Sequence, residues 1–397
     1  MPRPSNRRLP STGPDRGGFT LVELLIVFVI LALLIALLLP AINGAVRTAK
    51  NTAASTELKQ LDQALAAFKS KYGDYPPSRI LLCENGYYNI GLTTALAGAT
   101  PATQADITYG QLAQRSLSYL RKFFPKVVLS TSGAVWTAAD NQWYDFNGNG
   151  VLDPPYILQG HQALVFFLGG LPQSTSEGYA MTGFAKNPAN PFTPAIAGAA
   201  APAFFSNNRE QPLYEFKADR LLIDTVNTWA WNTSNIPGYL DNLGNTTTDG
   251  GQVNFIAYFS AYGSNAYDPN DVNFAVEEDG SLVKPILSRV YVRFPVYTNA
   301  GSTNNNVAVS PSPNPYTSTI TYSTTPSLAA TITYINPQTY QLISSGMDGQ
   351  YGPGGQFKSN NASEALPFDA GATISTDKSV RQREKDNLTN FRGGRLD

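Results

Sequence analysis

Two residue types that carry much of protein chemistry are almost absent from this sequence. Its 397 residues include one cysteine, Cys83, and one histidine, His161. One cysteine excludes an intramolecular disulfide, and one histidine excludes a paired-histidine mechanism or metal site within a single chain. We therefore expect His161 to be structural and Cys83 to be a buried small hydrophobe or a free thiol.

Charged residues are also scarce, and they are unevenly distributed. They make up 14% of the chain, and the formal net charge is −1. The first eighteen residues hold four arginines and one aspartate, which leaves a net charge near −4 for the remainder. This balance argues against a basic nucleic-acid-binding face, so we expect no nucleic-acid partner.

Long apolar runs are missing from most of the chain, but one lies near its start. Residues Leu21 to Leu39 are apolar except for Glu23. Counted from Phe19, the run would form about 31 Å of helix, enough to cross a bilayer core. The arginine-rich segment before it predicts a single-pass protein of the inner membrane with a cytoplasmic N-terminus and a periplasmic or extracellular head.

Two ordinary interpretations of this run leave a feature unexplained. A cleaved secretory signal would be shorter and would end in small residues, whereas this run ends in Leu37, Leu38, Leu39 and Pro40. A plain signal anchor fits the hydropathy but does not account for Glu23. A carboxylate in the hydrocarbon costs about 2.5–3.5 kcal/mol and usually has a partner.

The residues around Glu23 offer a third interpretation. The segment Gly18 to Leu25, GFTLVELL, resembles the cleavage and methylation motif of type IV prepilins. The resemblance implies that a prepilin peptidase cuts after Gly18 and methylates Phe19. Glu23 would then be the fifth mature residue, and its carboxylate would meet the Phe19 ammonium of a neighbouring subunit. Pro40 falls where many pilins carry a proline and where the helix bends or locally melts.

Apolar residues continue at helical spacing beyond the membrane segment. They predict an amphipathic helix that ends near Gly73, where the turn GDYPPS begins. A helix that ends in tyrosine before such a turn resembles the major pseudopilins of type II secretion. The apolar positions are Ala54, Leu58, Leu61, Leu65, Phe68 and Tyr72.

The pattern and the resemblance together predict an α+β, pilin-like fold. We expect a cytoplasmic leader (1–18), an N-terminal helix that is first transmembrane and then amphipathic (19–72), and an exported head with an antiparallel sheet and large loop insertions (73–397). A second helix is expected over Tyr109–Phe124, another apolar stretch covers His161–Leu168, and 186–206 and 298–316 are expected to be loops. The strand candidates are Val253–Tyr262, Val290–Tyr297, Thr317–Ser323, Ala330–Ile335 and Tyr340–Ser344.

Two glycine-rich segments have the composition of calcium loops. The first, DFNGNGVLD, places oxygen side chains at alternate positions before a glycine, although its twelfth position is tyrosine instead of the usual glutamate. The alternative is an Asn/Gly turn held by its own side chains. The candidate ligands of this first loop are Asp145, Asn147, Asn149 and Asp153.

The second segment, Ser344 to Gly355, resembles the C-terminal calcium loop of major pseudopilins. The resemblance implies Asp348 as a carboxylate ligand, with backbone carbonyls near Leu342 and Ser345. In that family an acidic–polar pair closes the site, and Asp386 with Asn387 is the nearest match here, about thirty residues further on. A glycine-rich hairpin loop is the alternative. Calcium is accordingly the one cofactor that the sequence predicts.

We interpret the sequence as a structural subunit of a type II secretion pseudopilus or a type IV pilus-like filament. The expected partners are further copies of the chain, the prepilin peptidase and the inner-membrane machinery of secretion or pilus assembly. The alternative is an anchored surface binding module, an adhesin or glycan-binding protein, in which tryptophans such as Trp136 and Trp143 could stack on sugars. An anchored hydrolase is disfavoured because the sequence shows no nucleophile motif beside its single histidine, so we expect no enzymatic activity.

Overall fold

The computed structural model describes residues 20–93, 107–140, 142–176, 178–195, 204–223, 234–243, 254–263, 267–268, 271–272, 313–321, 331–349, 351, 354–358 and 384–396. The chain divides into two compact units, Met1–Ala49 and Lys50–Asp397, and each is described here by itself. The division falls inside one long helix, α1 (Leu21–Tyr72), whose first part belongs to the first unit.

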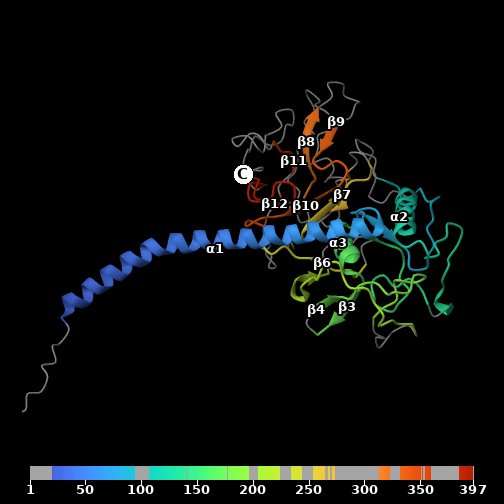
Figure 1. Ribbon diagram of the computed structural model, residues 1–397, viewed down its shortest axis with the longest axis horizontal. Coiled ribbons are helices and arrows are strands. Elements are labelled where there is room, and N and C mark those ends of the chain that lie inside the picture. The colour runs from blue at the N-terminus through green and yellow to red at the C-terminus, as the bar shows by residue number, and fades with distance from the viewer. Residues whose placement is uncertain are drawn as a thin grey trace, which may run out of the picture. The chain divides into compact units, whose positions relative to one another are not determined.

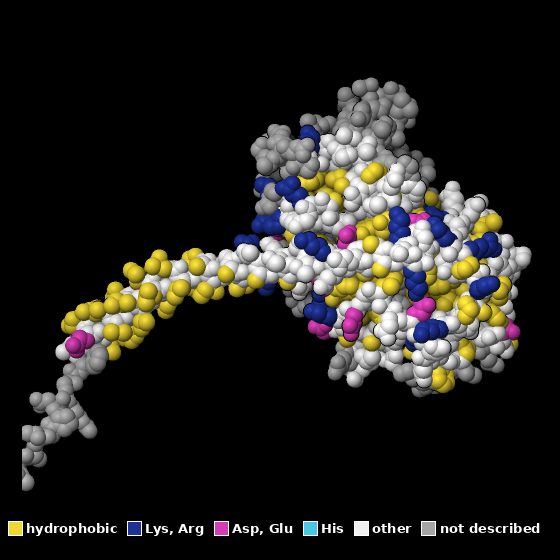
Figure 2. Space-filling view, in the orientation of Figure 1, with side chains coloured by type: hydrophobic (Ala, Val, Ile, Leu, Met, Phe, Trp, Pro, Cys, Tyr) yellow, Lys and Arg dark blue, Asp and Glu magenta, His cyan; other side chains and the backbone are white. Residues whose placement is uncertain are grey.

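In the first unit, hydrophobic side chains cover the face of α1 that is seen in Figure 2. They are exposed along the helix, from Leu21 to Val46. Among the described residues, α1 is the one helix long and apolar enough to cross a membrane. Helical structure continues through Pro40, so the local melting expected there is not found. Proline lacks only its own backbone N–H, so it removes one hydrogen bond of the helix and leaves those of the neighbouring turns.

In the second unit, the remainder of α1 buries one face in the head, as the spacing predicted. The helix ends at Tyr72, where Gly73 has a φ of +83° and donates its N–H to the Lys69 carbonyl at 2.8 Å. Glycine enters this left-handed conformation without a Cβ clash. Tyr72 is only partly buried. The buried residues of α1 are Ala54, Glu57, Leu58, Leu61, Ala64, Leu65 and Phe68.

In the described part of the head there are two more α-helices, two 3₁₀ turns and short strands. The helices are α2 (Tyr109–Phe123) and α3 (Gly160–Gly169), and the 3₁₀ turns are η1 (Ala138–Asp140) and η2 (Ala218–Arg220). The strands are β1 (Ile80–Leu82), β2 (Tyr156–Leu158), β3 (Pro172–Thr175), β4 (Gly178–Met181), β5 (Leu221–Leu222), β6 (Gly238–Tyr239), β7 (Ala257–Ser260), β8 (Tyr316–Thr321), β9 (Thr331–Tyr334), β10 (Tyr340–Ser344), β11 (Gly355–Gln356) and β12 (Leu388–Thr389).

The described strands form five small sheets, in which the pairing is antiparallel with one exception. The three-stranded sheets have the orders β12-β10-β7 and β11-β8-β9, and β11 pairs with β8 in parallel. The remaining pairs are β1-β2, β3-β4 and β5-β6. In the first sheet, Tyr340 faces Ser260 and Ile343 faces both Ala257 and Thr389. The α+β, pilin-like fold predicted from the sequence is therefore confirmed.

Most predicted elements are present with shifted ends. Strand β10 matches its predicted bounds, β7, β8 and β9 overlap theirs, and α2 is one residue shorter than predicted. The predicted strand at 290–297 and most of the predicted loop at 298–316 lie outside the described residues. The described parts of 186–206 contain no named strand or helix, as expected for a loop.

The core of the head forms where α1 meets α2 and α3. The fully buried ring of Phe68 lies edge-on to Phe123 at 5.1 Å and to Phe167 at 5.6 Å between ring centroids. Strand β10 reaches the same helix, because the Tyr340 hydroxyl donates to the Asp62 carboxylate at 2.6 Å. Figure 1 shows strands β7, β10 and β12 on one side of this part of α1, with α3, β6 and the β3-β4 pair on the other. The buried face of this part of α1 thus contributes to the core of the head, while its other face stays exposed.

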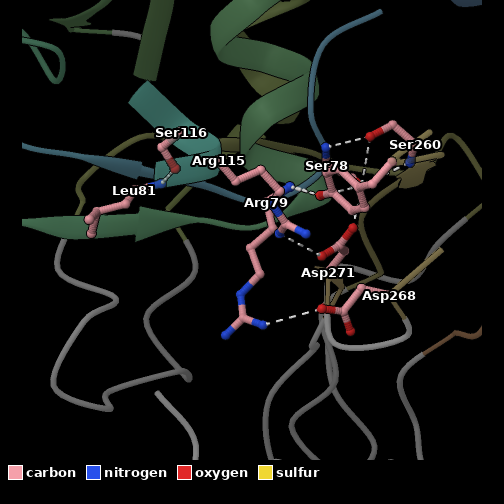
Figure 3. Close-up of polar contacts among 9 residues, drawn as sticks. Ser78, Arg79, Leu81, Arg115, Ser116, Ser260, Asp268 and Asp271 are labelled. Atoms are coloured by element: carbon pink, nitrogen blue, oxygen red, sulfur yellow. Dashed lines mark hydrogen bonds and ion pairs between the residues drawn. The ribbon is translucent and has the colours of Figure 1, made fainter. Parts of the chain in front are cut away.

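A buried polar cluster connects the chain that follows α1 to strand β7 (Figure 3). Ser78 donates its hydroxyl to Asp271 and also contacts Ser260 at 3.0 Å. Burial, together with the charge of Asp268, raises the pKa of Asp271 to about 7, although Arg115 opposes the shift. Ser78 and Asp271 are both fully buried, so this serine–carboxylate contact is closed to a substrate. Its role is to hold the two segments together.

Candidate assembly site and calcium loops

The start of α1 is held by a reciprocal pair of side chains, Thr20 and Glu23. The Glu23 carboxylate accepts the Thr20 backbone N–H at 2.8 Å and the Thr20 hydroxyl at 2.9 Å. In return, Glu23 donates its backbone N–H to the Thr20 hydroxyl at 3.2 Å. This is a capping box, in which residues three apart satisfy backbone groups that the first helical turn leaves free.

The capping box explains how a single chain can carry Glu23 in an apolar helix. The carboxylate has two donors from its own chain, which reduces the cost of placing it beside hydrocarbon. It also stays at the exposed beginning of the helix, where a group from another chain could reach it. Gly18 and Phe19, the predicted cleavage and methylation residues, lie outside the described residues.

The comparisons with known proteins bear on this segment. Residues 14–39 match the family described as "Prokaryotic N-terminal methylation motif". The N-terminal segment of the chain is type IV prepilin-like. The comparisons with curated proteins and with solved structures yield no match.

The match confirms the resemblance of the N-terminal segment to type IV prepilins, and its reach is limited to 26 residues. A prepilin motif implies processing by a prepilin peptidase and assembly into pilus-like machinery in general. An apolar helix that carries such a motif is also suited to anchor the chain in a membrane. The type of machinery, the membrane topology and the roles of individual residues stay predictions.

The first predicted calcium loop is satisfied by its own side chains. Asp145 accepts the backbone N–H groups of Asn149 at 3.2 Å and Gly150 at 2.9 Å. The amide groups of Asn147 and Asn149 both donate to Asp153 at 2.7 Å. These contacts are the ones expected of an Asn/Gly turn. Calcium binding at this loop stays a prediction.

Glu84, which was not among the predicted ligands, lies against the same loop. Its carboxylate accepts the Asp153 backbone N–H at 2.7 Å and the Tyr156 hydroxyl at 2.9 Å. Burial raises the pKa of Glu84 well above its usual value, and the charges of Asp145 and Asp153 raise it further. Burial likewise raises the pKa of Asp145 to about 7. The signal that could have found Glu84 is an acidic residue two positions after the apolar strand β1, next to the buried Cys83.

Asp386, the predicted closing residue of the second calcium loop, lies against that loop. Asp386 accepts the backbone N–H groups of Met347 at 2.7 Å and Asp348 at 3.0 Å. Gly346 has a φ of +69°, and a Cβ there would lie 2.3 Å from the Asp386 carbonyl oxygen, so glycine allows this approach. The residues between 358 and 384 therefore do not prevent Asp386 from reaching the loop. Asp348 itself is exposed, and the Leu342 carbonyl accepts the Asn390 N–H at 3.3 Å.

One buried side chain at this loop, that of Asn387, has an oxygen of the type that binds a hard cation. Asn387 is fully buried and donates to the Tyr351 carbonyl at 2.9 Å, while its Oδ1 has no hydrogen-bond partner among the described residues. Amide and carboxylate oxygens are the ligand types that calcium takes. Within the described part of the chain, however, no three His, Cys, Asp or Glu side chains are grouped to hold a metal. The side-chain oxygens at this loop are of the types that calcium takes as ligands. Backbone carbonyl oxygens would have to supply the remaining ligands.

The remaining candidates have structural surroundings. His161 is buried and stacks on Phe255 with ring centroids 4.8 Å apart. Cys83 is buried, which raises the pKa of its thiol to about 12 and keeps it protonated at neutral pH. Trp143 is also buried, so its ring is not available to stack on a sugar. Trp136 is half-buried, and Trp229 and Trp231 lie outside the described residues.

Proposed function

We propose that the chain is a structural subunit of a filament, either a type II secretion pseudopilus or a type IV pilus-like fibre. The observation that carries the proposal is the methylation motif on a helix with apolar side chains on all sides. Cleavage after Gly18 would free the Phe19 amine, and the Glu23 carboxylate of another copy would bind it. The Glu23 carboxylate would then accept from an ammonium instead of the Thr20 N–H and hydroxyl, and this charge-assisted contact is stronger.

Two further observations support a structural role over an anchored binding module. The part of α1 that belongs to the second unit packs into the core of the head, so this stretch of helix is part of the head itself. Of the two described tryptophans, Trp143 is buried and Trp136 is half-buried. In this proposal the N-terminus faces the cytoplasm and the head lies outside the inner membrane.

Matched glycine variants test the processing step on which the filament depends. Gly18→Val should leave the precursor uncut and abolish filaments, because the peptidase needs the glycine at the cut. Gly17→Val, one residue away, should be processed and should assemble. The readouts are electrophoretic mobility of the membrane-bound chain and electron microscopy of sheared filaments. Processing of both variants, or of neither, contradicts the proposal.

We also propose that the second loop binds calcium, with Asp386, Asn387 and Asp348 as side-chain ligands. Calcium at about 100 times its Kd would add about 2.7 kcal/mol to the free energy of unfolding. Removal by a chelator should therefore lower the melting temperature by roughly 5 °C. Asp386→Asn should abolish this shift, while Asp153→Asn in the first loop should leave it. An equal melting temperature with and without chelator would exclude calcium at both loops.

A further inference from the structure

Two buried asparagines contact the second loop in the same way. Asn254 donates its Nδ2 to the Gly349 carbonyl at 2.7 Å, and Asn387 donates its Nδ2 to the Tyr351 carbonyl at 2.9 Å. The two asparagines are 3% and 0% exposed, and the Oδ1 of each has no hydrogen-bond partner among the described residues. Asn387 is one of the proposed calcium ligands, whereas Asn254 has no assigned role.

The two hydrogen bonds determine the orientation of each side-chain amide. A backbone carbonyl can only accept, so the atom that contacts it is the Nδ2 donor, and the Oδ1 remains as an acceptor. A buried acceptor without a partner is unfavourable. The Oδ1 of Asn254 is therefore suited to bind either a water molecule or a cation, as that of Asn387 is.

The order of the sheet β12-β10-β7 brings both asparagines to the same end of β10 (Figure 1). Both neighbouring strands run antiparallel to β10. Asn254 lies three residues before β7, Asn387 directly precedes β12, and the second loop follows β10. In an antiparallel sheet the end of one strand lies beside the beginnings of its neighbours. The two asparagines therefore reach the loop from the two strands that flank β10.

The charges at the loop favour a cation over a water molecule. Asp348 lies in the loop, and Asp386 accepts two of its backbone N–H groups. The buried Asp241 accepts a third, that of Ser345, at 2.9 Å. In the described part of the chain, no three acidic, histidine or cysteine side chains are grouped to hold a metal. Neutral oxygens would have to complete a calcium site here, and amide oxygens are among the ligands that calcium takes.

We propose that Asn254 is a further calcium ligand of the second loop, through its Oδ1. One ion then connects the ends of all three strands of the β12-β10-β7 sheet, since its ligands precede β7, follow β10 and precede β12. The inference rests on the calcium site proposed above. It adds a ligand that the loop pattern does not contain, because Asn254 is 95 residues from Gly349.

Two substitutions at Asn254 separate a ligand from a structural contact. Leucine and aspartate are close to asparagine in shape, and both remove the Nδ2 that holds Gly349, but only aspartate keeps an oxygen. Isothermal titration of calcium chloride into the full-length, chelator-treated chain in detergent micelles gives the Kd. Asn254→Leu should raise the Kd at least about tenfold. Asn254→Asp should lower it by about threefold or more, because a charged oxygen replaces a neutral one.

Asn242→Asp is the control for added charge alone, because Asn242 is exposed and next to Asp241. Its Kd should lie within about twofold of that of the unsubstituted chain. If Asn254→Leu does not fold, the comparison of Asn254→Asp with Asn242→Asp still decides, because only the first should bind calcium more tightly.

Two results would overturn the role of Asn254 and leave the calcium site in place, with Asp386→Asn still abolishing binding. The first is an equal rise of the Kd in Asn254→Leu and Asn254→Asp, which would mean that Asn254 only holds Gly349. The second is an unchanged Kd in both variants, which would mean that its Oδ1 binds water. A different result, no binding of calcium by the unsubstituted chain, would overturn the calcium site and this inference together.

Discussion

Replacing Glu23 with alanine is expected to reduce filament assembly roughly a hundredfold while cleavage after Gly18 continues. A carboxylate in the hydrocarbon costs about 2.5–3.5 kcal/mol, and a partner's ammonium recovers much of this cost in the filament. Alanine removes the cost of the buried carboxylate in the single chain, and it also removes the stabilisation that the ion pair would give on assembly. The lost driving force corresponds to roughly two factors of ten in an equilibrium constant. Sheared filaments measured against the total processed chain give the ratio.

The capping box provides the control for this prediction. Thr20→Val keeps the shape of the side chain and removes the hydroxyl, which makes two of the three Thr20–Glu23 hydrogen bonds. The loss of a helix cap costs about 0.5–2 kcal/mol, but the Glu23 carboxylate remains. Assembly of the Thr20→Val chain should therefore exceed that of the Glu23→Ala chain. Normal filament yield from Glu23→Ala would show that the carboxylate has no role between subunits.

Replacing Glu57 with alanine is expected to destabilise the head by about 3–5 kcal/mol, because it leaves a buried guanidinium without its carboxylate. Glu57 lies on α1 and forms an ion pair with both terminal nitrogens of Arg220, and the two side chains are 11% and 12% exposed. Arg220 also donates to the Leu240 carbonyl and stacks 4.1 Å from the centre of the Tyr239 ring. Unfolding of the full chain in detergent, followed by circular dichroism, measures the loss.

A second ion pair in the same head serves as the control. Lys71 and Glu210 also connect α1 to a distant segment, but their side chains are 40% and 36% exposed. Such a pair contributes at most about 1 kcal/mol, so Glu210→Ala should be nearly neutral. The double variant Glu57→Leu/Arg220→Met should recover most of the stability lost in Glu57→Ala, because apolar residues replace both charges. Similar losses for Glu57→Ala and Glu210→Ala would contradict this account.

Helices and strands whose ends are determined by residues close in sequence could be predicted from the sequence. The spacing of apolar residues in α1 and the turn after it predicted where the helix ends, since Gly73 alone terminates it. Strand β10 was predicted with its bounds, because a short run of five residues, all of them buried, lies between two turn segments. The buried positions 54, 57, 61, 64 and 68 of α1 also follow helical spacing. That spacing places Glu57 on the buried face, a signal from which a buried partner could have been predicted.

The contacts between distant residues could not be predicted in the same way. Arg220 is 163 residues from Glu57, and nothing in its local sequence marks it as the partner. Glu84 is separated by 69 residues from Asp153, whose backbone it holds, so the first loop was predicted without it. Asp386 was named as the closing residue only through resemblance, and the structure supplies the contact with Met347 and Asp348. Tertiary packing, and not local propensity, determines these pairs.

The central claim is that one acidic side chain in the apolar helix is held ready for an amine that cleavage creates on another copy. Mass spectrometry of the N-terminus of the chain purified from membranes tests it most directly. The account predicts a chain that begins with N-methylated Phe19. An intact leader, or a chain cut after residue 40, would contradict it.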